Sequence, residues 1–108
     1  MSDNICIKDV LGNGEGVIVT NVDFEENYSK IKSFAIVLIF FQGKEKYEVI
    51  KYDFSEKENF NVHYNYLKKQ KKIFIEKEVS VEDIIKIKQE ITINWRKLVL
   101  KYKQNNYI

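Results

Sequence analysis

The stretch that decides the fold is "KSFAIVLIFFQ", residues 32–42. Apolar residues fill both alternating sets of positions, Phe34, Ile36, Leu38 and Phe40 in one and Ala35, Val37, Ile39 and Phe41 in the other. A strand with one face in water alternates apolar and polar residues, so this pattern predicts a central strand with a layer packed on each face. The apolar run has eight residues. A membrane-spanning helix needs about 20, so the stretch is not a membrane span.

Hairpins are expected on both sides of this strand. "GNGEG" (12–16) is followed by the β-branched "GVIVTNVDF". Its glycine spacing differs from that of a dinucleotide-binding loop, which also requires a helix directly afterwards. We therefore predict a hairpin turn in which Asn13 and Gly14 supply positive φ angles.

The chain after the central strand continues as a series of short β elements. We predict a turn at 42–46, a strand at 47–53, a charged loop at 54–60 and a second hairpin at 61–77. In the strand, simple alternation puts Tyr47, Val49 and Lys51 on one side.

The hydrophobic period then changes to that of a helix. "SVEDIIKIKQEITINWRKLVLKYKQ" (80–104) begins with Ser80 and Asp83 in capping positions. Its apolar residues recur at spacings of three and four. The predicted stripe consists of Val81, Ile84, Ile85, Ile91, Trp95, Leu98, Val99 and Tyr102.

These elements predict one α+β domain over residues 1–108, an antiparallel meander of about five strands with one long C-terminal helix across one face. The second face of the central strand is then uncovered, as are Ile87, Ile93 and Leu100 on the helix. Exposed apolar surface of this kind predicts a partner, most simply a second copy in a homodimer.

Charge is distributed unevenly along the chain. Residues 1–60 carry 7 basic and 11 acidic side chains, a net charge of −4, whereas residues 61–108 carry 11 basic and 5 acidic, a net charge of +6. Such a field can steer a polyanion to one side of a protein. The N-terminus lacks a signal-peptide pattern, which predicts a cytoplasmic protein.

Cysteine and histidine are too few for most site chemistry. Cys6 is the only cysteine, which excludes an intramolecular disulfide, and it is interpreted as a small apolar residue of the first strand. Cys6 and His63 offer no ligand-pair spacing, so we predict no metal site and no cofactor.

Asp53 and His63 form the candidate catalytic pair. Asp53 ends one predicted strand and His63 begins the next, so both can lie at one end of the sheet. A carboxylate can orient a histidine that acts as a general acid or base. The alternative is that His63, the only histidine, is an ordinary surface or core residue.

The second candidate site is the basic hairpin. Cations bind phosphate and aromatic rings stack on unpaired bases, so the hairpin suggests contact with RNA or DNA. Its residues are Tyr64, Tyr66, Lys68, Lys69, Lys71 and Lys72, and the helix end adds Arg96, Lys97, Lys101 and Lys103. The alternative is a solvated turn and a helix end with its usual lysines.

The middle third of the chain resembles the TumE-like family of small prokaryotic toxin–antitoxin proteins. The matching pieces are "YEVIKYD" ending in Tyr52-Asp53, then His63, then "VSVEDII" with Ser80 and Asp83. The family has a His-x-His element where this chain has one histidine, and the second slot is Asn61 or Asn65. The resemblance implies a helix-turn-helix antitoxin partner and a target in RNA or translation.

Three hypotheses follow. The first is a toxin-like protein acting on RNA, with Asp53 and His63 at its site and the hairpin lysines holding phosphate. The second is a non-enzymatic homodimeric interaction protein, which needs the apolar faces. The third is a simple nucleic-acid-binding module, which needs the lysines and a strong salt dependence.

Overall fold

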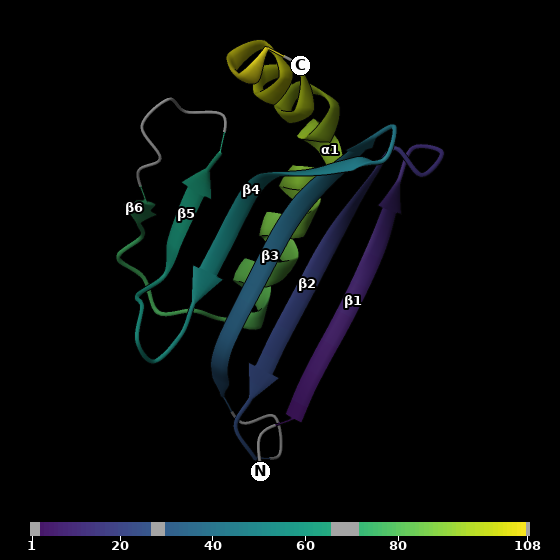
Figure 1. The fold of residues 1–108 in the computed structure, drawn as a ribbon. Coiled ribbons are helices and arrows are strands. Elements are labelled where there is room, and N and C mark those ends of the chain that lie inside the picture. The colour runs from purple at the N-terminus through teal and green to yellow at the C-terminus, as the bar shows by residue number, and fades with distance from the viewer. Residues whose placement is uncertain (1–2, 27–29, 66–71, 108) are drawn as a thin grey trace.

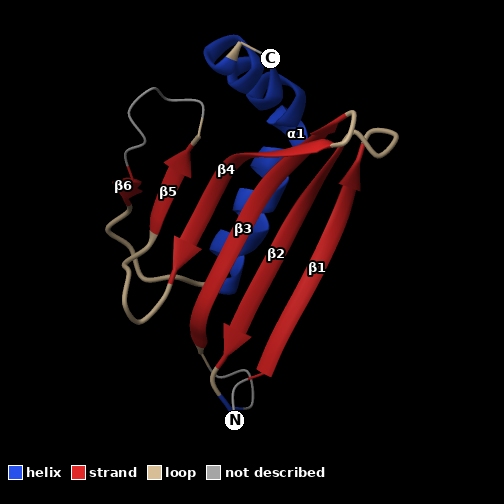
Figure 2. Ribbon diagram, viewed as in Figure 1, coloured by secondary structure: helices blue, strands red, loops and turns tan. Residues whose placement is uncertain are grey.

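The computed structural model describes residues 3–26, 30–65 and 72–107. Six strands form one antiparallel sheet in chain order, and one α-helix packs behind it in the view of Figures 1 and 2. The elements are β1 (Asp3–Leu11), β2 (Gly16–Phe24), β3 (Ile31–Gln42), β4 (Glu45–Phe54), β5 (Asn61–Tyr64), β6 (Lys72–Phe74) and α1 (Val81–Asn106). The predicted α+β meander is thus confirmed, with six strands in place of about five.

Strand β3 lies inside the sheet, between β2 and β4, as its sequence predicts. Only one of its faces is covered. Ile36, Leu38 and Phe40 are at most 2% exposed beneath α1, whereas Val37 and Ile39 on the opposite face stay partly exposed. We call these the covered face and the open face of the sheet. Figure 1 is seen from the open face, with α1 passing behind the strands.

The turn between β1 and β2 differs from the prediction. Gly12 and Gly14 have positive φ angles of 59° and 87°, whereas Asn13 does not have one. A Cβ on Gly12 would also lie 3.3 Å from the ring of Trp95. Glycine is therefore favoured at this position for its φ angle, and a larger residue would also crowd Glu15 and Trp95.

Strand β4 contains a bulge that breaks the predicted alternation. Leu38 is opposite Ile50 and Ile39 is opposite Glu48, so Val49 is the extra residue. A bulge shifts the following side chains by one position relative to simple alternation. As a result Tyr47, which stacks on the core residue Phe40, lies on the covered face and not beside Lys51.

The helix starts as the sequence predicts. Ser80 is the N-cap, its hydroxyl accepts from the Asp83 amide, and the Asp83 carboxylate accepts from the Ser80 amide, completing a capping box. Lys77 also contacts this carboxylate, and together these contacts lower the pKa of Asp83 despite its burial.

The buried stripe of α1 differs in part from the prediction. Ile87 is buried, although it was assigned outside the stripe, whereas Val81 and Ile85 are each 49% exposed. Ile93 and Leu100 are exposed as expected, at 81% and 54%. The helix is oriented so that Ile87, and not Val81 or Ile85, faces the sheet, because α1 packs mainly on β3 and β4. No helix among the described residues has the length and hydrophobicity needed to cross a membrane.

Candidate functional site

Strand pairing brings Asp53 and His63 to the same face of the sheet. Asp53 is opposite Asn61, and His63 is opposite Lys51. Opposite residues of an antiparallel pair share a face, as do residues two apart on one strand. Asp53 and His63 are therefore diagonal neighbours on the open face, because the alternate residue Tyr52 points toward the helix.

Two lysines lie beside them, Lys51 near Asp53 itself and Lys72 paired with Glu58. Lys51 Nζ lies 3.9 Å from the Asp53 carboxylate, and His63 is flanked in the sheet by Lys51 on β4 and Lys72 on β6. The Nε2 atom of His63 is buried and has no hydrogen-bond partner among the residues that the structure describes. A buried Nε2 cannot exchange a proton with a substrate, so catalysis through this atom requires the imidazole to turn toward solvent.

Both positions for a second histidine hold asparagines with structural contacts. The amide of Asn61 donates to the backbone oxygens of Asp53 and Asn59, at 3.3 and 2.8 Å, and is itself buried. The amide of Asn65 donates to the backbone oxygen and the carboxylate of Glu48, at 3.0 and 2.8 Å. These amides tie β5 to β4 and to the loop between them.

The predicted nucleic-acid residues are divided by the structure. Tyr66, Lys68, Lys69 and Lys71 lie outside the described residues. Lys72 is on the open face opposite His63 and forms an ion pair with Glu58. Tyr64 is opposite Ile50 on the covered face, so the sheet separates it from Lys72.

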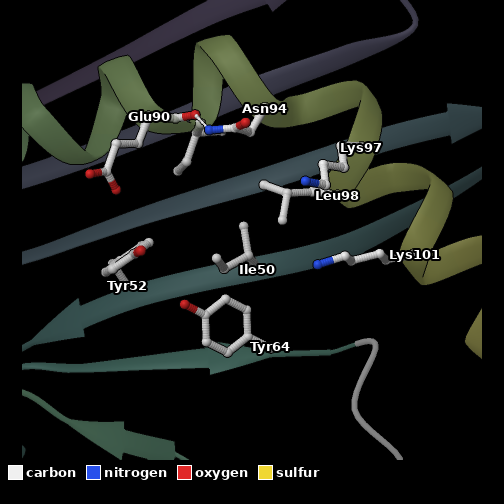
Figure 3. A pocket seen from close by; sticks show the side chains of 9 residues that line it. Ile50, Tyr52, Tyr64, Glu90, Asn94, Lys97, Leu98 and Lys101 are labelled. Atoms are coloured by element: carbon white, nitrogen blue, oxygen red, sulfur yellow. Dashed lines mark hydrogen bonds between the residues drawn. The ribbon is translucent and has the colours of Figure 1, made fainter.

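Tyr64 lines a groove between α1 and strands β4 and β5 (Figure 3). The groove has a volume of about 200 Å³. Ile50, Tyr52 and Tyr64 form its floor, and Glu90, Ile91, Asn94, Lys97, Leu98 and Lys101 come from the helix. We call it the tyrosine–lysine groove.

Local structure accounts for this set. Ile50 and Tyr52 are two apart on β4, so both point toward the helix, and Tyr64 joins them through its pairing with Ile50. On the helix, spacings of three and four place Lys97 and Lys101 on the same side. In Figure 3 both lysine side chains extend toward the floor of the groove.

The helix around the groove is strongly basic. From residue 91 to residue 107 it carries four cations and no acidic side chain. Arg96 lies over the Trp95 ring at 4.4 Å, and Lys103 lies 5.4 Å from the Phe40 ring. Lys97 and Lys101 are the two that line the groove, with Glu90 as its one acidic group.

The sequence pointed to these lysines but not to their neighbours. Tyr52 and Asn94 were not identified as candidates, because their proximity to Tyr64 depends on how the helix lies on the sheet. The groove is formed by α1, β4 and β5, so a pattern of lysines and aromatic residues within one chain segment does not predict it.

No three His, Cys, Asp or Glu side chains gather closely enough to hold a metal ion within the described ranges. Cys6 is exposed on β1 and is not a core residue. Comparison with known protein families, with curated proteins and with solved structures finds no match to this chain.

Proposed function

We propose that this protein binds single-stranded RNA through the tyrosine–lysine groove. The observation that carries the proposal is that the Tyr64 ring and the ammonium groups of Lys97 and Lys101 line the same hollow. Aromatic rings stack on unpaired bases and lysines bind the adjoining phosphates, which is how proteins hold single strands without strong sequence preference.

The size of the groove suits this ligand. Pockets for drug-sized molecules usually have volumes of about 300–1,000 Å³. At about 200 Å³ the groove has room for one base or one phosphate and not for a larger compact ligand. A polymer that places one group in the groove and passes over the basic helix fits better than a small metabolite.

The direct test is binding of a fluorescent 12-nucleotide oligouridine at several salt concentrations. Each phosphate contact to a single strand contributes about −0.7 to the slope of log affinity against log salt. For Lys97→Ala/Lys101→Ala we therefore expect a slope about 1.4 less steep. The matched control is Lys32→Ala/Lys57→Ala, which removes two exposed lysines that do not line the groove.

Stacking is tested separately at Tyr64. Removing one base–aromatic contact costs about 1–3 kcal/mol, so Tyr64→Leu should weaken binding roughly 5- to 150-fold. Tyr64→Phe keeps the ring and should bind nearly as the native chain does. Absence of oligouridine binding at low salt, or equal slopes for the groove and control variants, contradicts the proposal.

A toxin-like activity on RNA is the second candidate. The placement of Asp53 and His63 on one face favours it, because His63 lies between Lys51 and Lys72 in the sheet and an imidazole beside cations could act near a phosphodiester once it turns toward solvent. The family resemblance adds a helix-turn-helix antitoxin as the proposed partner. This activity would use the open face, whereas the groove lies on the covered face.

Growth of a bacterial host on induction of the chain tests this candidate. Arrest by the native chain that is relieved by His63→Ala, with the circular dichroism spectrum unchanged, would support an enzyme. Relief only by Lys68→Ala/Lys69→Ala/Lys71→Ala/Lys72→Ala would point to nucleic-acid binding by the hairpin. Normal growth with well-expressed native protein would contradict toxicity in that host.

A further inference from the structure

The two edges of the sheet differ greatly in length. At one edge, β6 has three residues, Lys72–Phe74. At the other, β1 has nine, Asp3–Leu11, and β2 is its one neighbour among the described strands. An edge strand presents a row of unpaired backbone N–H and C=O groups, and short edges are one way in which proteins avoid pairing with other chains. Strand β1 lacks that protection.

Proline and a bulge, two other protective features, are also missing from β1, although the strand does carry the charged residues Asp3, Lys8 and Asp9. It contains no proline, and its nine residues pair with β2 in an unbroken register without a bulge. The helix packs mainly on β3 and β4. It reaches β1 near Asp9 and Leu11 but leaves Ile5 36% and Ile7 42% exposed. Figure 1 shows β1 at the margin of the sheet, to one side of α1.

We propose that β1 is the interface of a homodimer, in which it pairs antiparallel with β1 of a second copy. A two-fold axis requires that the numbers of opposite residues add up to a constant. That constant must be even. With an odd value, opposite residues would have their side chains on different faces of the sheet, which antiparallel pairing does not allow. Registers centred on Cys6, Ile7 or Lys8 pair at least seven of the nine residues of β1, and these are the candidates.

Charge selects among these registers. Centring on Cys6 places Asp3 opposite Asp9, and centring on Lys8 places two copies of Lys8 opposite each other. Like charges directly opposite are destabilising. Centring on Ile7 avoids both, pairs all nine residues and sets Ile7 against Ile7. The full set of pairs is Asp3–Leu11, Asn4–Val10, Ile5–Asp9, Cys6–Lys8 and Ile7–Ile7.

The charged side chains of Asp9 and Lys8 are compatible with the register centred on Ile7. The Asp9 carboxylate is already held by Lys88 at 2.9 Å in its own chain, so facing Ile5 of the second copy leaves no unpaired anion. Lys8 is exposed on the other face and keeps its ammonium group in water while facing Cys6. The assembly would be one sheet of twelve strands, six from each copy, with both helices on the same face.

The size of this interface sets the expected strength of the dimer. A standard interface has about 20–30 residues on each side. Strand β1 contributes nine, together with the hollow of about 710 Å³ beside it, lined by Leu11, Ile85 and Ile93 among others. We therefore expect a dimer in equilibrium with monomer, visible as a mass that rises with concentration.

Sedimentation and light scattering over a range of concentrations test the proposal. The native chain should approach twice its 12.9 kDa mass. Ile7→Lys would set two ammonium groups against each other and should remain monomeric. The matched control is Ile73→Lys on the β6 edge, where the native side chain is 47% exposed and the same charge is added.

Cysteine cross-linking tests the register. Opposite residues of an antiparallel pair have Cα atoms about 4.5–5.5 Å apart, within the range that a disulfide spans. Three proteins with one cysteine each are compared under mild oxidation: the native chain with Cys6, Cys6→Ser/Ile7→Cys and Cys6→Ser/Lys8→Cys. We expect the second to form the covalent dimer fastest.

Three outcomes would overturn the proposal. One is a 12.9 kDa particle at every concentration. Another is a native dimer that Ile7→Lys leaves intact and Val37→Lys on the open face disrupts, which would move the interface to that face. Fastest cross-linking at Cys6 or at position 8 would overturn the register centred on Ile7.

Discussion

The covered and open faces of the sheet carry similar apolar residues, but those of the covered face are buried and those of the open face are partly exposed. On β3, Ile36 and Leu38 are completely buried beneath α1, whereas Val37 and Ile39 are partly exposed although they are equally apolar. The difference comes from the layer above them and not from the strand. An apolar side chain can therefore be buried on either face, and the position of the helix determines which apolar side chains form the core.

Dimensions explain why one helix leaves so much uncovered. A helix with its side chains is about 10–12 Å wide. Six strands at a spacing of about 4.8 Å extend over roughly 24 Å. One helix can cover part of one face, which accounts for the exposure of Ile5 and Ile7 on β1 as well as for the open face.

The largest expected effect is a direct comparison of the two faces at one residue type. Ile36→Ala should lower the free energy of unfolding by about 2–5 kcal/mol, because it leaves a cavity in a closed core. Ile39→Ala on the same strand should cost about 1 kcal/mol, because a partly exposed site loses less burial and leaves no closed cavity. Urea unfolding of both variants measures the difference.

Equal losses of unfolding free energy in the two variants would contradict the difference between the two faces. If Ile39→Ala proved as damaging as Ile36→Ala, the open face would be covered in solution. Repeating the measurement at several protein concentrations separates a second copy from an intramolecular cover, since only the former makes the loss depend on concentration.

A smaller effect is expected from weakening the helix that covers one face. Ser80→Ala removes the hydroxyl that accepts from the Asp83 amide and should cost about 1 kcal/mol. Ser55→Ala is the matched control, since the Ser55 hydroxyl accepts from the Lys57 amide in an exposed loop, at 3.3 Å. A change in unfolding free energy for Ser80→Ala no greater than for Ser55→Ala would show that the cap does not stabilise the covered face.

The smallest expected effect is on how the free energy of unfolding changes at acidic pH. Contacts with Lys77 and Ser80 lower the pKa of Asp83 at the helix start, and hydrogen bonds from Asn4 and Ser33 lower the pKa of Asp23 on the open face. A carboxylate with a lowered folded-state pKa adds stability above its unfolded pKa of about 3.9, which is lost as the pH falls through the folded value.

Asp83→Asn and Asp23→Asn should each reduce stability at pH 7 and flatten its decline below about pH 4, where the native carboxylate loses its advantage. We expect the greater flattening for Asp83→Asn, because Asp83 is buried and contacts an ammonium group. Unfolding free energies between pH 2 and pH 7 provide the measurement. A native-like acid decline in Asp83→Asn would contradict this assignment.

Much of the fold could be predicted because its signals are local. The turn glycines, the period-two strands, the change of period near residue 80 and the Ser80–Asp83 cap all depend on neighbours within a few residues. The bulge at Val49 could not be predicted, since it has no local signature in "YEVIKYD" and arises from pairing with β3.

The candidate sites were predictable only in part. The sequence indicated that Asp53 and His63 lie at one sheet end, but their common face depends on the register of β4 against β5. The grouping of Tyr64 with Lys72 was a reasonable reading of a hairpin, yet the two side chains lie on opposite faces. Tyr64 instead lines the same groove as Lys97 and Lys101, which are more than 30 positions away in the chain.

The sequence by itself determined the kinds of element, their order and the excess of apolar residues over what one helix can bury, because backbone preference and hydrophobic period are properties of short segments. Tertiary structure alone decided which apolar set became the core, which side chains share the tyrosine–lysine groove and which strand was left as a long open edge. These depend on register and on the position of the helix, and both are set by packing between residues distant in the chain.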